Sequence, residues 1–157
     1  MIARPEQLAT APRLIAHFQV FGRPAPQGSK KYVGRGIMIE SSKRVAPWRE
    51  AVKAAFLATR EAPPRFDGPV RVEIRFLFER PKKPRHSRPS TKSSGDLDKL
   101  LRSTFDALVD VGILIDDSLV VEDGSSKHYV ADGEVPGAVI VVREVAAVAA
   151  GGREAIR

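Results

Sequence analysis

The chain has 157 residues, 43% of them hydrophobic, which is enough for one folded domain with a core of its own. The absence of cysteine excludes disulfides and thiolate metal sites, and it suits a reducing cytoplasm. No apolar run approaches the roughly 20 residues of a membrane-spanning helix, and the first residues lack the apolar stretch of a secretory signal. We therefore expect no membrane partner. The formal net charge of +7 favours a polyanionic one.

The first half of the chain carries two strand patterns and one helix pattern. Residues 1–13 show no period and are expected to form a flexible arm. Alternating apolar side chains predict a strand at 14–21, and a second strand lies within 31–40, interrupted by glycines. Apolar residues at helical spacing predict a helix over 46–61, which Pro63-Pro64 must end.

The second half contains the clearest strand and the clearest helix. Strict alternation from Val70 to Phe78 predicts a strand with one buried face. A strongly apolar helical face begins at Leu97, and Gly112 offers a stop. The intervening residues 80–95 contain three prolines and four serines and no core-forming side chain, so they predict an exposed, mobile loop.

Three short strand patterns close the domain. Residues 119–121 and 127–130 indicate two strand pieces with a bulge or turn at Gly124. Residues 138–145 are almost continuously β-branched, which predicts a strand buried on both faces. The Ala/Gly-rich residues 146–157 are expected to form a flexible tail.

This order of elements defines the expected fold. Strands, a helix, a strand, a loop, a helix and further strands predict an α+β protein in which a small mixed sheet carries two helices, within a single domain at 14–145. Neither a GxGxxG nor a Walker A motif is present, so no nucleotide cofactor is expected.

Positive charge is concentrated in one segment. Between Arg80 and Arg102 stand eight basic residues against two acidic ones, a net +6 out of the total of +7. Such a focused stripe attracts phosphates, although a solvated basic loop is the alternative. The residues of this loop that are predicted to bind DNA are Lys82, Lys83, Arg85, Arg88 and Lys92.

Carboxylates follow this segment directly. Asp96 and Asp98 stand at the junction of the loop and the second helix, and Asp116-Asp117 follow that helix. If the chain folds back after Gly112, Asp117 can join the first pair, and converging carboxylates bind a hard cation such as Mg²⁺. Bound magnesium assists phosphodiester hydrolysis. The alternatives are a helix cap at one of the first two aspartates and plain turn residues at 116–117.

Two cations near this pair suit a catalytic role. Lys99 and Arg102 stand one and four residues after Asp98 and can stabilise charge that develops on a phosphate. The three histidines, His17, His86 and His128, lack the spacing of metal ligands.

Three motifs together resemble those of the RusA-like Holliday junction resolvases of bacteria and their phages. The resemblance covers residues 69–145 and, less closely, 14–61. Its motifs are Asp96-Leu97-Asp98-Lys99-Leu100, Phe105-Asp106-Ala107-Leu108 and Ile115-Asp116-Asp117-Ser118-Leu119-Val120-Val121.

The resemblance implies a mixed α/β homodimer that cuts four-way DNA junctions symmetrically, in DNA recombination and repair. It also implies Mg²⁺ dependence, with Mn²⁺ as a substitute, and a place in the cytoplasm of a bacterial or phage-infected cell. Asp96, Asp98 and Asp117 match the metal-binding aspartates of the family. Arg102 occupies the place of a catalytic lysine, and Lys99 stands where asparagine is common. Arginine keeps the charge of lysine but is a poor proton donor.

Three functions are compatible with these residues. The first is a junction-resolving endonuclease. The second is a magnesium nuclease of the same fold that acts on other branched or flap DNA. The third is a basic DNA-binding module without catalysis, which the Arg102 substitution favours and the intact aspartates disfavour.

Overall fold

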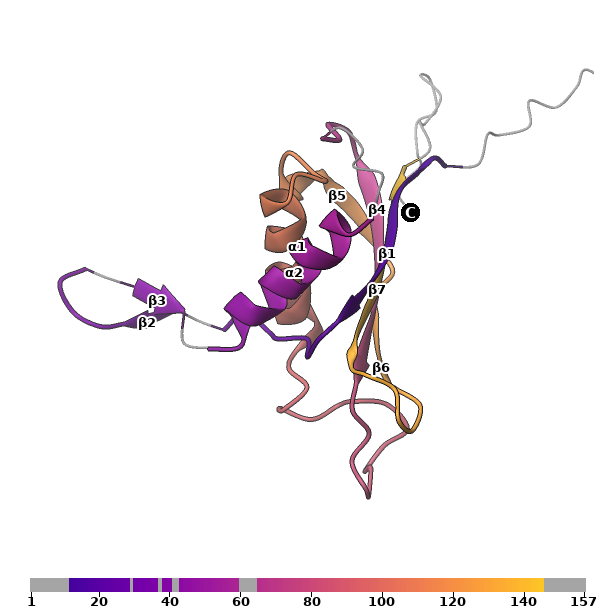
Figure 1. Cartoon of the computed structure of the whole chain (residues 1–157). Helices are drawn as coiled ribbons and strands as arrows, with labels where there is room; N and C mark the ends of the chain where they lie inside the picture. The colour runs from indigo at the N-terminus through magenta and orange to yellow at the C-terminus, as the bar shows by residue number, and fades with distance from the viewer. Residues whose placement is uncertain (1–11, 29, 37, 41–42, 60–64, 146–157) are drawn as a thin grey trace, which may run out of the picture.

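The computed structural model describes residues 12–28, 30–36, 38–40, 43–59 and 65–145 (Figure 1). The predicted arm and tail lie almost entirely outside this range. Within it, a five-stranded mixed sheet, two α-helices and a separate two-stranded hairpin are present, as the α+β prediction requires. The elements in chain order are β1 (Leu14–Phe21), β2 (Lys30–Tyr32), β3 (Met38–Glu40), α1 (Val45–Leu57), β4 (Val70–Phe78), α2 (Leu97–Asp110), the 3₁₀ turn η1 (Asp117–Leu119), β5 (Val120–Asp123), β6 (Ser126–Tyr129) and β7 (Gly137–Glu144).

The sheet combines antiparallel and parallel pairs. Its order is β1-β7-β4-β5, and β6 also pairs with β4. The strand β7 runs antiparallel to both β1 and β4, whereas β5 and β6 run parallel to β4. Parallel neighbours need a long crossover between them, and the loop at 80–95 with α2 supplies it. This crossover brings the start of α2 toward the end of β4.

Both helices cover the same face of the sheet (Figure 1). Alternate residues of β4 from Val70 to Phe76 are fully buried, and α1 and α2 pack their apolar faces on them. The rings of Trp48 and Phe76 lie 6.4 Å apart between centroids. The indole N–H of Trp48 donates to Thr104 Oγ1 at 3.0 Å, which joins α1 to α2 inside the core.

The structure confirms some predicted bounds and corrects others. The strands at 14–21 and 70–78 are as predicted. The strand expected within 31–40 is a hairpin of two short strands, β2 and β3, which projects away from the sheet in Figure 1. Helix α1 ends at Leu57 rather than at 61, so it stops before the prolines.

The prediction that residues 138–145 are buried on both faces is wrong. Within β7, Ala138, Ile140 and Val142 are buried, but Val139 and Val141 are only partly buried. The reason is that both helices lie on one side of the sheet, so no described element covers the other side of β7. The β-branched run of β7 therefore reflects its position inside the sheet, between β1 and β4, and not burial of both of its faces.

The break between β5 and β6 lies at the glycine where a turn was expected. Gly124 N donates to Val72 O, and Ser125 Oγ accepts from Ile74 N at 3.0 Å. At the point where the neighbour of β4 changes from β5 to β6, the N–H of Ile74 thus donates to a serine side chain instead of to a backbone carbonyl. None of the described helices is long and apolar enough to cross a membrane.

Candidate functional site

The start of α2 is shaped by Gly95 and Asp96. Gly95 has φ +80°, a left-handed conformation that favours glycine, and a Cβ there would lie 2.6 Å from Pro26 Cγ. Asp96 is extended, with φ −77° and ψ 141°, and Leu97 is the first helical residue. The chain therefore enters α2 through a sharp turn packed beneath Pro26.

Asp96 occupies the N-cap position but does not cap the helix. Its side chain makes no capping hydrogen bond. The carboxylate instead pairs with Lys99, at 3.1 Å between Oδ2 and Nζ, and both side chains are largely exposed. Exposed ion pairs are weak, so a stronger cation or a phosphate can displace this one. Asp98, in the first turn, is also exposed. Both carboxylates are accessible to a ligand.

Lys127 of β6 holds the turn that precedes these carboxylates. Its ammonium donates to Ser94 Oγ at 3.1 Å and to Gly95 O at 2.8 Å. Burial lowers the pKa of Lys127, and the charge of Asp96 opposes that shift. Sequence reasoning placed Lys127 only in a strand piece. Its contact with Gly95 depends on the parallel pairing of β6 with β4, for which the local pattern carries no signal.

The turn after β1 supports α2 from the other side. Gln27 N donates to Lys99 O at 3.0 Å, and Ser103 Oγ donates to Ala25 O at 2.6 Å. Within the described part of the chain, Gln27 Oε1 is buried without a hydrogen-bond partner. Gln27 is thus bonded to the first turn of α2 through its backbone N–H, while its side-chain carbonyl oxygen has no protein partner among the described residues.

The two adjacent aspartates at 116–117 have different roles. Asp116 Oδ1 accepts from Ser118 N at 2.8 Å, and the hydrogen bonds from Ser118 lower the pKa of Asp116. Asp116 is thus the turn residue that one interpretation expected. Asp117 begins η1. Both aspartates are exposed, but the carboxylate of Asp116 is the one held by Ser118.

The structure does not gather all three predicted metal ligands in the single chain. η1 contacts α2, but the strand after it begins with Val120 paired to Val70, at the start of β4. Lys127, which holds the Asp96 turn, pairs with Phe76 near the end of β4. Within the described ranges, no group of three His, Asp or Glu side chains is placed to hold one metal ion.

The two predicted catalytic cations differ in their partners. Lys99 forms an ion pair with Asp96. Arg102 lies one helical turn after Asp98 on the same side of α2 and is exposed. No ion pair or hydrogen bond engages the Arg102 side chain within the residues that the structure describes. Its guanidinium is therefore available to an external anion.

The basic loop is exposed but attached to the sheet, at Arg88 as well as at the turn that Lys127 holds. Lys82, Lys83, Arg85 and Lys92 are exposed. Arg88 is exposed too, but its Nε donates to Lys127 O at 2.8 Å, and its Nη2 lies 3.2 Å from His128 Nε2. Burial and then the charges of Arg88 and Arg75 lower the pKa of His128, which favours the neutral ring beside Arg88. Arg88 thus ties the loop to the edge of the sheet.

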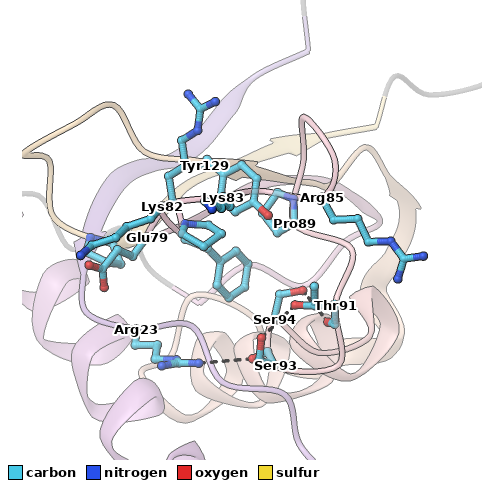
Figure 2. A pocket seen from close by; sticks show the side chains of 14 residues that line it. Arg23, Glu79, Lys82, Lys83, Arg85, Pro89, Thr91, Ser93, Ser94 and Tyr129 are labelled. Carbon is cyan, nitrogen blue, oxygen red and sulfur yellow. Dashed lines mark hydrogen bonds between the residues drawn. The ribbon is translucent and has the colours of Figure 1, made fainter.

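A cavity of about 620 Å³ opens between this loop and the end of β4. Figure 2 shows Tyr129, Lys82 and Lys83 along one wall, with Arg23, Ser93 and Ser94 along the opposite wall. Arg23 Nη2 donates to Ser93 O at 3.3 Å across the base of this second wall. We call this cavity the Tyr129 pocket. Its lining residues are Arg23, Phe78, Glu79, Arg80, Pro81, Lys82, Lys83, Arg85, Pro89, Thr91, Ser93, Ser94, Tyr129 and Pro136.

Accessible carboxylates at a helix start, an available arginine and a cationic loop together form a candidate site for a phosphate-bearing polyanion. The sequence model of the family Endodeoxyribonuclease RusA matches residues 22–143, which include all of these groups. The chain therefore belongs to the RusA endodeoxyribonuclease family, whose members are hydrolases that act on Holliday junctions and generally depend on a divalent metal ion. A comparison with curated proteins found no match.

Proposed function

We propose that this protein is a magnesium-dependent endonuclease that resolves four-way DNA junctions by paired phosphodiester hydrolysis, in recombination and repair. The observation that carries the proposal is the pair of accessible carboxylates, Asp96 and Asp98, at the start of α2 within the region matched by the family. We further propose a homodimer as the working unit, in the cytoplasm of a bacterial or phage-infected cell.

The donor set suits magnesium by its chemistry. Mg²⁺ is usually held by one or two carboxylates together with waters and substrate phosphates, so Asp96 and Asp98 meet the minimum requirement. Mn²⁺ accepts the same oxygen ligands. Asp117 is the proposed third ligand. Within the described residues it is not grouped with the other two in the single chain, so its participation requires its carboxylate to move toward the start of α2.

The residues of the chain have separate roles in the proposed reaction. The bound ion supplies charge neutralisation and a more acidic water. Arg102 stabilises the negative charge that develops on the phosphate, without donating a proton, because a guanidinium stays protonated. Lys99 pairs with Asp96, and Asp96 would leave that pair if it held the ion. Lys127 fixes the turn from which Asp96 projects, and the basic loop holds the DNA backbone.

The separation of Asp117 from the other aspartates favours a second candidate, a DNA-binding module without catalysis. A nuclease that prefers flap or other branched DNA is the third. Incubation with labelled four-way junction, duplex and flap DNA, with and without magnesium, separates them. The proposed function predicts paired cuts in the junction only when metal is present. Binding without cleavage would establish the second candidate, and preferential flap cleavage the third.

Single aspartate substitutions test the residues. Asp96→Asn, Asp98→Asn and Asp117→Asn remove a charge while keeping the shape, so cleavage should fall by orders of magnitude while junction binding persists. The matched control is Asp116→Asn, whose amide oxygen still accepts from Ser118 N and which should cleave like the wild type. Full metal-dependent cleavage by Asp98→Asn would overturn the metal assignment. Full cleavage by Asp117→Asn would show only that Asp117 is not the third ligand.

A further inference from the structure

The Tyr129 pocket has features that backbone binding alone does not require. A surface that only follows phosphates needs exposed cations, and Lys82 and Lys83 would suffice for that. The Tyr129 pocket is a concave site instead of a flat surface, and two paired residues of the sheet contribute aromatic rings to its lining. Phe78 and Tyr129 are register partners in β4 and β6. Phe78 is buried, and Tyr129 is partly buried.

The volume and charge of the pocket fit one nucleotide. Its volume of about 620 Å³ lies within the range of roughly 300–1,000 Å³ that small-ligand pockets occupy. Its described lining includes five cationic side chains and a single carboxylate, Glu79. Figure 2 shows the guanidinium of Arg85 pointing away from the cavity, while Lys82 and Lys83 lie along its wall. An aromatic surface with a cationic rim suits a base joined to a phosphate.

The pocket also adjoins the proposed cleavage site. Ser94 lines it and precedes Asp96 by two residues, so their Cα atoms are at most about 7 Å apart. The hydrogen bonds of Lys127 to Ser94 and Gly95 fix that short segment. A nucleotide held against Ser94 is therefore close to the carboxylates that act on its strand.

We propose that the Tyr129 pocket binds one unpaired nucleotide of branched DNA, with its base against the rings of Tyr129 and Phe78. The phosphate of that nucleotide lies among the cations of the rim. A base inside a duplex enters only if its pairing and stacking are broken, whereas a nucleotide at a branch point or bulge is less costly to extrude. This inference rests on the proposed function for its DNA substrate. It adds recognition of a DNA base to a site that otherwise contacts only the sugar-phosphate backbone of the DNA.

The test places the fluorescent base 2-aminopurine at a branch-point position of a four-way junction and, separately, as a single unpaired nucleotide in a duplex. Measurements in EDTA exclude cleavage, so the result does not depend on nuclease activity. Saturation with the wild-type protein should change the 2-aminopurine emission in both probes and leave a fully paired probe unchanged. No change in either unpaired probe would overturn the inference.

Variants at Tyr129 assign the signal to the pocket. Tyr129→Phe keeps the ring and should keep the signal. Tyr129→Leu keeps apolar bulk without a ring, so it should weaken binding of the unpaired probe about tenfold, as loss of one base–aromatic stack does. The control is Tyr32→Leu, which changes the other tyrosine of the chain, an exposed residue of the hairpin. An unchanged signal in Tyr129→Leu would exclude the pocket.

Two further outcomes separate this inference from the proposed function. Junction cleavage by the wild type without any 2-aminopurine signal would refute the pocket and leave the nuclease intact. The signal without cleavage in magnesium would refute the nuclease and leave the pocket. If deoxyadenosine monophosphate, which matches the purine probe, displaced the labelled base as effectively as an unlabelled strand does, the pocket would belong to a free nucleotide, and the inference would be wrong.

Discussion

At the scale of single residues, neighbours of the same type have different roles because their side chains meet different partners. Asp116 and Asp117 are both exposed, but Asp116 Oδ1 accepts a hydrogen bond from Ser118 N in the turn that begins η1. Lys82 and Lys83 extend from the loop, whereas Arg88 is bonded to the edge of β6. The structure therefore divides each cluster of like charges into residues that maintain the fold and residues that remain available to a ligand.

Arg102 and Lys99 differ in whether their side chains already have a partner in the protein. Because Arg102 is available and Lys99 is paired with Asp96, Arg102→Ala should lower the cleavage rate by about 10²–10³-fold, the usual effect of removing one group that stabilises a transition state. Junction affinity should change much less, and Arg102→Lys should retain or improve activity. Single-turnover rates and binding measured side by side check this. A damaging Lys99→Ala with a harmless Arg102→Ala would assign the role to Lys99.

His128 predicts a pH dependence of stability. Its pKa is lowered in the folded protein, so below an unfolded-state pKa of about 6.5 the unfolded chain binds more protons than the folded one. The contribution of His128 to stability is therefore full above that value and is lost as the pH falls through the folded pKa. Urea denaturation at about pH 7.5 and 5.5 should show a smaller loss in His128→Gln than in the wild type.

The control for this experiment is His17→Gln, which changes an exposed histidine of β1. It should retain the pH dependence of the wild type. An identical loss of stability on acidification in His128→Gln and the wild type would show that protonation of His128 does not weaken the attachment of the loop.

At the scale of elements, the position of α2 determines the site. Its start is bonded to β6 through Lys127 and to the turn after β1 through Gln27 N, and its middle is bonded to α1 through Thr104 and Trp48. The basic loop enters this helix and is anchored by Arg88. Because the loop is attached near the carboxylates, the cations that it carries act close to the proposed site of hydrolysis.

The salt dependence of junction binding tests the role of the loop. Each phosphate contact contributes about 0.9 to the slope of log affinity against log salt on duplex arms. Replacing Lys82, Lys83 and Arg85 by Ser should flatten that slope by up to about three such increments and weaken binding at low salt. Arg88 is left in place because it holds the loop to β6. A slope equal to that of the wild type would mean that the loop faces away from DNA.

At the scale of the whole molecule, neither of the two described helices covers the second face of the sheet (Figure 1). The apolar face of β4 is buried beneath α1 and α2, so it is not available as a subunit interface. The uncovered face combines polar and apolar side chains, such as Gln19 and Arg75 on either side of Val139. A homodimer remains our proposal because resolution needs two cuts, and one chain offers a single carboxylate pair at α2.

The dimer proposal is tested by mass and by mixing. Sedimentation at micromolar concentration should give about twice the chain mass of 17.2 kDa. Wild type mixed with an excess of Asp98→Asn should form heterodimers that nick one strand without releasing resolved duplexes. Paired cuts on each junction by a strictly monomeric protein would contradict the proposal.

The sequence by itself determined the elements and the family, because both depend on local order along the chain. The alternation from Val70 to Phe78 and the apolar face after Leu97 are properties of neighbouring residues, and the structure has a strand and a helix there. The motifs around Asp96 and Asp117 pointed to the RusA family in the same way, and the family match contains both.

Only the tertiary structure decided which side chains are available. Lys127 meets Gly95 across 32 residues, and Arg88 meets Lys127 O across 39, so no window of the sequence contains either contact. The partial burial of Val139 and the separation of Asp117 from Asp96 likewise depend on how distant elements pack. Side-chain type specifies the chemistry that a residue can perform, but the packing of distant elements determines whether its partner is the protein or a ligand.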